Sequence, residues 1–179
     1  MKRVASVLSV LLLLAVATPD RAHAQSWQNQ VYFNAGPQFV TGDQADSYKT
    51  GFAIDGGYYY RASSNLFIGL AGGYHQFAGE GAVDDLTIIP VHLAAKYNFK
   101  LTGVQPYIGL EGGPYFANTG GEGDTNFGLA PRVGFRIPLS RGFDLDINAK
   151  YNVIFQDEDN FTYVGVNGGP AYIPNRSLR

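Results

Sequence analysis

The sequence contains no cysteine, and its 179 residues include one methionine and one tryptophan. Without cysteine, the chain can form neither a disulfide framework nor a thiolate metal site, and it has no thiol nucleophile. A basic tract is also lacking, because 13 Lys and Arg residues stand against 15 Asp and Glu residues. A mildly acidic chain of this kind has no electrostatic footprint for nucleic acid. These absences exclude a disulfide-stapled module, thiol chemistry and a nucleic-acid partner.

Long hydrophobic runs are scarce as well. The apolar run at residues 4–17 is about 14 residues long, shorter than the ~20 needed to cross a bilayer as a helix. Two basic residues precede it and Ala22-His23-Ala24 follows it, which predicts a cleavable signal peptide over residues 1–24 and a mature domain over 25–179. An uncleaved anchor is the alternative, and the short run disfavours it. The mature chain would keep 10 of 13 basic and 14 of 15 acidic residues.

A period-two alternation between residues 31 and 172 is the main feature that is present. In eight segments every second side chain is apolar, aromatic or glycine, and none of these positions carries Asp, Glu, Lys or Arg. Alternating segments of about ten residues are typical of strands whose outer face contacts lipid. The fold class that this predicts is all-β, an eight-stranded antiparallel up-and-down transmembrane β-barrel. Its expected strands are residues 29–40, 50–60, 65–77, 86–99, 104–116, 126–138, 143–155 and 162–173.

The connections between these strands fall into two classes. Three are short and basic, at residues 61–64, 100–103 and 140–142, whereas the other four are longer and acidic. Alternating short and long connections indicate a barrel whose two rims face different compartments. Aromatic residues gather at both strand ends, as the interface girdles of such barrels do. They are Tyr58, Tyr60, Tyr97, Phe99, Phe143 and Tyr172 at the short-turn end, and Phe39, Tyr74, Phe116, Phe127 and Phe155 at the other.

Seven prolines fall within or near the predicted strands. Each removes a backbone donor that a lipid-facing ladder would use. We therefore expect most of them to lie at rims or bulges. They are Pro37, Pro90, Pro106, Pro114, Pro131, Pro138 and Pro170.

The inward face is polar, small and balanced in charge. Because an eight-stranded barrel is only just wide enough for its side chains, we predict a filled interior with a structural polar network and no wide pore. Hairpin geometry places Arg136 opposite Asp146, and His92 near Glu111. The predicted network comprises Asp55, His75, His92, Lys96, Glu111, Arg132, Arg136, Asp144, Asp146 and Lys150.

No motif for catalysis or cofactor binding emerges. An acyl-hydrolase needs a nucleophile beside a base, but the serines fall in turns and terminal segments, and His75 and His92 both face inward. The histidines match no metal-ligand spacing, and the acidic residues at 157–160 lack the spacing of a calcium loop. We therefore expect no enzyme activity, no cofactor, no catalytic residue and no metal site.

From residue 25 to 179 the chain resembles the outer-membrane β-barrel domain family of Gram-negative bacteria, the small OmpA- and OmpX-like barrels. The resemblance rests on the export signal, the alternating strands, the short turns on one rim and the last strand's Val164 to Gly169. It implies a cell outer-membrane location and a monomer in contact with outer-membrane lipid. Barrel-assembly machinery and periplasmic chaperones are the implied partners during biogenesis. Family members commonly end on an aromatic residue, whereas here Tyr172 is followed by seven more residues.

The function that these features predict is that of a non-enzymatic envelope barrel with a structural role and a weak surface contact. Two other functions compete with it. A soluble periplasmic lipid-binding barrel would turn the apolar face inward and need a Lys- and Glu-rich outer face, whereas the polar face here is Gly, Ala and Asn with paired charges. A lipid A-modifying barrel enzyme would need the nucleophile and base that the sequence does not pair.

Overall fold

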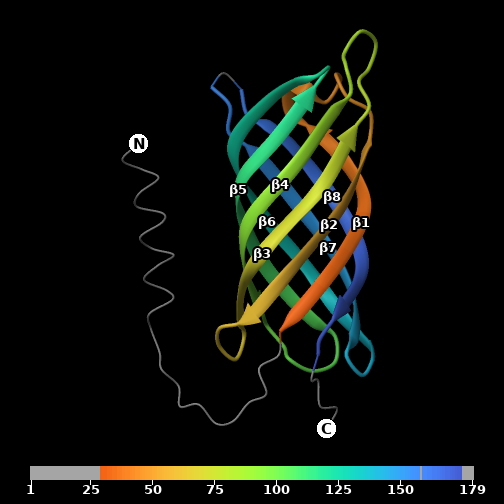
Figure 1. Cartoon of the computed structure of the whole chain (residues 1–179). Coiled ribbons are helices and arrows are strands. Elements are labelled where there is room, and N and C mark those ends of the chain that lie inside the picture. Colours follow the sequence, from red (N-terminus) through yellow and green to blue (C-terminus); the bar gives the residue numbers. More distant parts are fainter. Residues whose placement is uncertain (1–28, 158, 175–179) are drawn as a thin grey trace.

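The computed structural model describes residues 29–157 and 159–174. The predicted signal peptide at 1–24 and the end of the C-terminal tail, 175–179, lie outside the described residues. Within the described part, eight strands close into one antiparallel barrel in which each strand pairs with its sequence neighbours and β1 pairs with β8 (Figure 1). They are β1 Gln30–Thr41, β2 Gly51–Arg61, β3 Leu66–Phe77, β4 Leu86–Asn98, β5 Gln105–Thr119, β6 Glu122–Ser140, β7 Phe143–Ile154 and β8 Phe161–Tyr172.

The predicted strand order and the antiparallel barrel are confirmed. One connection differs from the expectation, because the predicted loop at residues 117–125 is mostly strand, with Thr119 paired to Glu122. Gly120 and Gly121 form the turn with φ of 59° and 95°. Two successive residues at positive φ match the twist of the flanking strands, so the hairpin stays paired to its tip. The first long loop contains a short 3-10 turn, η1 Gly42–Gln44.

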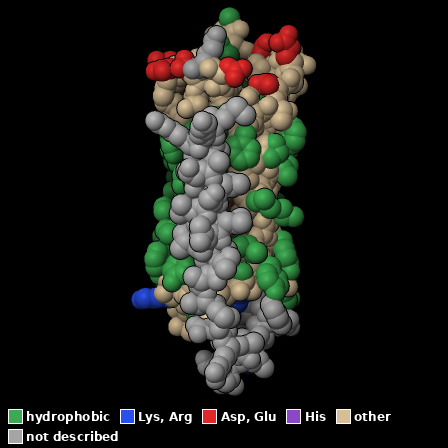
Figure 2. All heavy atoms as spheres, turned by 90° about the vertical axis from the view of Figure 1, so that its left-hand side faces the viewer, with side chains coloured by type: hydrophobic (Ala, Val, Ile, Leu, Met, Phe, Trp, Pro, Cys, Tyr) green, Lys and Arg blue, Asp and Glu red, His purple; other side chains and the backbone are tan. Residues whose placement is uncertain are grey.

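Side chains alternate between the lumen and the outer surface along every strand. The outward face is apolar and exposed, reaching 72% for Leu93 and 61% for Leu70. Figure 2 shows hydrophobic side chains along the barrel wall and acidic side chains gathered at one end. A soluble lipid-binding barrel would have its apolar face inside, so that alternative is not the architecture of this chain.

The aromatic residues predicted to form two girdles all project outward. Each of the eleven has at least 37% of its surface exposed. At the short-turn end, Phe143 and Tyr172 face one another across β7 and β8, with ring centroids 5.0 Å apart. Tyr97 and Phe99 form a second pair at 5.5 Å. Rings at both ends of an apolar band are the arrangement expected at the two membrane interfaces.

The expectation that most prolines lie at rims or bulges is wrong. Pro138 lies at the bulge between β6 and β7, and Pro106 and Pro170 lie near strand ends. The other four lie inside strands β1, β4, β5 and β6, which run through without a break. Proline is compatible with extended backbone, and pairing on both sides of a missing bond holds the register. The interior prolines are Pro37, Pro90, Pro114 and Pro131.

Three of the prolines follow an inward glycine, and these Gly-Pro steps share one geometry. The β1–β8 ladder is interrupted between Ala35↔Gly168 and Gln38↔Gly165, where Pro37 faces Val166. A Cβ atom at Gly36 would collide with the carbonyl oxygen of that same Val166. The glycine Cα therefore closely approaches the carbonyl to which proline cannot donate, as in the weak Cα–H···O contacts between strands.

The same relation holds at the other two steps. Gly113 approaches the carbonyl oxygen of Val91, which faces Pro114, and Gly169 approaches that of Phe33, which faces Pro170. A side chain at any of these glycines would push the strands apart. The glycines allow the wall to stay closed where proline interrupts the ladder.

Candidate functional site

The candidate site is the barrel interior. All ten residues of the predicted network point into it, and each has at most 4% of its surface exposed. They come from β2 to β7, where their positions alternate with the lipid-facing ones. Local strand periodicity is sufficient to turn these side chains inward, but it does not specify their partners.

Two carboxylates organise the middle of the lumen. Asp55 Oδ1 lies 2.9 Å from Lys150 Nζ and 3.1 Å from His75 Nε2. Glu111 lies 3.1 Å from Arg132 Nη1 and 3.6 Å from Lys150 Nζ. Lys150 thus bridges both carboxylates and connects β2, β5 and β7 across the barrel.

His92 joins the same group through Glu111, with 3.5 Å between His92 Nδ1 and Glu111 Oε2. The predicted proximity of these two residues is confirmed, although the residue directly opposite Glu111 is Ala94. His92 lies on the diagonal from Glu111. Diagonal neighbours in a ladder are within reach of long side chains.

A second polar group lies around Asp146. Its Oδ1 accepts hydrogen bonds from Asn34, Tyr107 and Asn148, at 3.1, 2.8 and 2.8 Å. The predicted register of Arg136 opposite Asp146 is confirmed. Arg136 nevertheless forms its ion pair with Asp144, at 3.7 Å, because a long guanidinium side chain can reach the diagonal neighbour.

Inward tyrosines surround two of the cations. Lys96 Nζ lies 4.3, 5.2 and 5.4 Å from the ring centroids of Tyr59, Tyr107 and Phe67, and donates to Gln30 Oε1 at 2.6 Å. Arg132 lies over the same two tyrosines and donates to the Tyr59 hydroxyl at 2.6 Å. Desolvated cations gain most from such ring faces. These tyrosines were not among the predicted network residues, although they alternate along their strands in step with the inward-facing residues.

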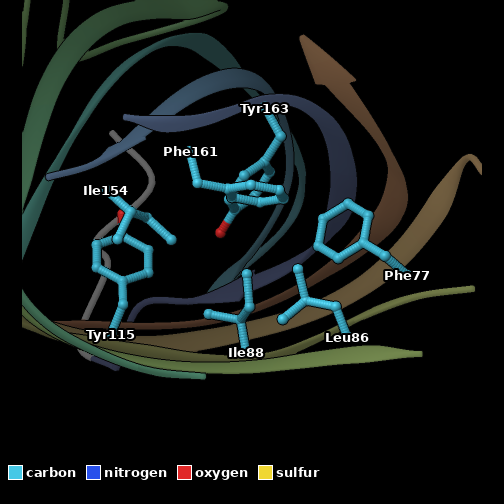
Figure 3. Close-up of a cluster of buried hydrophobic side chains, with 7 residues drawn as sticks. All are labelled: Phe77, Leu86, Ile88, Tyr115, Ile154, Phe161 and Tyr163. Atoms are coloured by element: carbon cyan, nitrogen blue, oxygen red, sulfur yellow. The ribbon is translucent and has the colours of Figure 1, made fainter. Parts of the chain in front are cut away.

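The loop end of the lumen is apolar rather than polar, which corrects the expectation of a small, polar inner face. Figure 3 shows the cluster of seven buried side chains that lies there. The Tyr163 hydroxyl links this cluster to the polar network, since it lies 2.7 Å from His75 Nδ1. The cluster consists of Phe77, Leu86, Ile88, Tyr115, Ile154, Phe161 and Tyr163.

Tyr163, His75 and Asp55 form a chain of hydroxyl, imidazole and carboxylate, the order of groups in a nucleophilic triad. Tyr163 and His75 are completely buried, and Asp55 also binds Lys150. A nucleophile acts only where substrate can reach it. Among the described residues, no group of His, Cys, Asp or Glu side chains could hold a metal ion. The interior geometry therefore neutralises charge and joins strands.

The long-loop rim is strongly acidic. Its loops are joined by backbone hydrogen bonds from Lys49 to Ala78 and from Glu80 to Ser47, both 2.9 Å, so the first two loops pack together. Glu158 lies outside the described residues. The exposed carboxylates of this rim are those of Asp43, Asp46, Glu80, Asp84, Asp85, Glu122, Asp124, Asp157 and Asp159.

In the part of the chain that the structure describes, no helix is long and apolar enough to cross a membrane. A closed barrel with an apolar outer wall, two aromatic girdles and a charged interior defines an integral membrane β-barrel. The family model described as the outer membrane protein beta-barrel domain matches residues 8–172. The chain belongs to this family and is an outer-membrane β-barrel protein.

Solved structures show the same fold. Neisserial surface protein A is 19% identical, with a TM-score of 0.69, over 80% of this chain and 96% of that chain. OprG from Pseudomonas aeruginosa is 14% identical with a TM-score of 0.54 over 86% and 99%, and Ail from Yersinia pestis is 15% identical with 0.52 over 83% and 100%. Comparison with curated proteins finds no match. At these identities the likeness shows the fold alone.

Proposed function

We propose that this protein is a non-enzymatic, non-conducting structural barrel of the outer membrane that supports envelope integrity. The observation that carries the proposal is the occupied interior. Lys150, Asp55, Glu111 and Arg132 join opposite walls at mid-lumen, and the seven-residue apolar cluster fills the loop end. A channel would need a continuous aqueous path through both layers.

The absence of enzyme activity is part of the proposal. His75 and His92 are in the lumen with at most 1% of their surface exposed, and the hydroxyl beside His75 belongs to the buried Tyr163. A barrel enzyme that modifies lipid A would need its nucleophile and base together at a lipid-accessible position.

Conductance and folding assays test the proposal together. A sample of the full mature chain is refolded into lipid vesicles and checked by its altered gel mobility before and after boiling. In planar bilayers we expect the folded species to give no steady open-channel current. A stable open conductance from the heat-modifiable species would overturn the non-conducting assignment, and release of fatty acid from lipid A would overturn the non-enzymatic one.

The envelope role needs a test in cells. Deletion of the gene in the bacterium that encodes the protein is expected to increase sensitivity to detergents and bulky antibiotics, and wild-type protein should restore resistance. A variant with Asp43, Asp84, Asp85 and Asp124 changed to Asn keeps the barrel but weakens the acidic rim. Full rescue by this variant would limit the function to the membrane-embedded wall, whereas failed rescue would assign part of it to a surface contact. Unchanged sensitivity after deletion would overturn the envelope role.

A further inference from the structure

The lipid-facing wall contains a groove between β5, β6, β7 and β8. Its volume is about 470 Å³. Gly109 and Ala149 are the small residues among its lining, and larger side chains surround them. These larger residues are Ile108, Pro131, Val133, Tyr151 and Val164.

The groove coincides with an interruption of the β6–β7 ladder. Pairing stops between Leu129↔Val153 and Arg132↔Lys150, where Pro131 faces Tyr151. Both of these residues line the groove. A local break in pairing and the small side chain of Ala149 therefore meet at one place on the wall.

The depth of the groove in the membrane follows from the girdles. Ala149 lies six residues from Phe143, the first residue of β7, and six from Phe155, which directly follows the end of β7. The two exposed rings mark the two interfaces. Six residues of a strand tilted by about 40° rise roughly 15 Å, half the thickness of the hydrocarbon layer. The groove is therefore at the middle of the bilayer.

We propose that this groove binds one acyl chain of an outer-membrane lipid, held longer than the lipids around the rest of the wall. Headgroups lie too far away to reach mid-bilayer. Water finds few partners there, because Arg132 and Lys150, which also contribute to the lining, are buried with 3% and 2% of their surface exposed. A hydrocarbon chain matches both the apolar lining and the depth.

Native mass spectrometry of protein released from palmitoyl-oleoyl phosphatidylethanolamine nanodiscs tests this proposal. The wild type is expected to keep one phospholipid through stepwise lipid removal, and A149F, which fills the groove, is expected to lose it. Ala95 is also lipid-facing but lies on β4 outside the groove, so A95F serves as the matched control and should retain the lipid. The altered gel mobility shows that each variant is folded, and A149L provides a smaller filling residue if A149F does not fold.

Nuclear Overhauser effects distinguish contact with acyl chains from contact with lipid headgroups. With methyl-labelled alanine, the Ala149 methyl is expected to show a contact with acyl-chain protons and none with headgroup protons. Equal lipid retention by wild type and A149F would overturn the proposal, and so would a homodimer that A149F abolishes. These results leave the proposed structural role intact, because conductance and cell sensitivity measure it independently.

Discussion

Lys150 Nζ lies 2.9 Å from Asp55 Oδ1, which joins β7 to β2 through the middle of the lumen. The same ammonium group also lies 3.6 Å from Glu111. Lys150 is therefore the shared cation of two buried carboxylates. Residues far apart in the sequence determine whether the interior charges are balanced.

Replacement of Lys150 by Met should destabilise the barrel by about 3–5 kcal/mol, because it leaves two buried carboxylates without their common cation. Urea unfolding in lipid vesicles measures the loss. The double variant K150M/D55N serves as the control and should recover part of the stability, since one of the orphaned charges is then removed. An unchanged unfolding midpoint for K150M would show that water enters and screens the network.

Introducing a charge into the lipid-facing wall should also be costly. Leu110 points outward on β5, six residues from the girdle residue Phe116. Leu110→Arg is expected to reduce the unfolding free energy by about 2–4 kcal/mol, the cost of Arg near the bilayer midplane. Leu101→Arg, in an exposed short turn, is the matched control and should change stability by less than about 1 kcal/mol. Equal effects of the two substitutions would contradict the predicted depth.

Gly36 should tolerate no side chain. Gly36→Ala places a Cβ on the Val166 carbonyl and is expected to cost about 1–3 kcal/mol or more at the seam that closes the barrel. Gly168→Ala is the control in the same seam, because its Cβ would lie 3.7 Å from the nearest heavy atom, the Asp146 carbonyl oxygen. That substitution should be neutral or slightly stabilising. Unfolding in urea compares the two, and an equal cost would remove the close approach as the cause.

The hydroxyl of Tyr163 should contribute modestly to stability. Tyr163→Phe keeps the ring packed against Phe77 and removes the hydrogen bond to His75, so we expect a loss of about 1–3 kcal/mol. Tyr163→Ala, which also empties part of the apolar cluster, should cost about 3–5 kcal/mol. For each variant, the stability loss is measured from the temperature at which the gel band of the folded protein gives way to that of the unfolded protein. Equal losses would mean that the ring alone has no packing role.

Much of the architecture was predictable from local pattern. The two faces of each strand and the eight strand positions follow from the alternation, because successive side chains of an extended chain point to opposite sides. The prolines were misjudged for a tertiary reason. Whether Pro37 can lie inside β1 depends on the facing strand, where Gly36 approaches Val166.

In the interior, too, local pattern decides which side chains face inward, and tertiary structure decides which of them meet. Parity along each strand was sufficient to place Asp55 and Lys150 inside, but nothing local indicates that they meet, since they are separated by two other paired strands on one side of the barrel and four on the other. The inward tyrosines around Lys96 and the apolar cluster near Tyr163 were missed because aromatic residues suit either face of a membrane strand.

The sequence alone determined the eight strands, their lipid-facing sides, the two unequal rims and the identity of the buried charges, because each depends on a period of two residues and on turn length. Only the tertiary structure decided which charges pair, where the lumen becomes apolar, how the ladder survives its prolines and where the wall is recessed. These features depend on the register and closure of the barrel, which bring distant strands together at distances of a few ångströms.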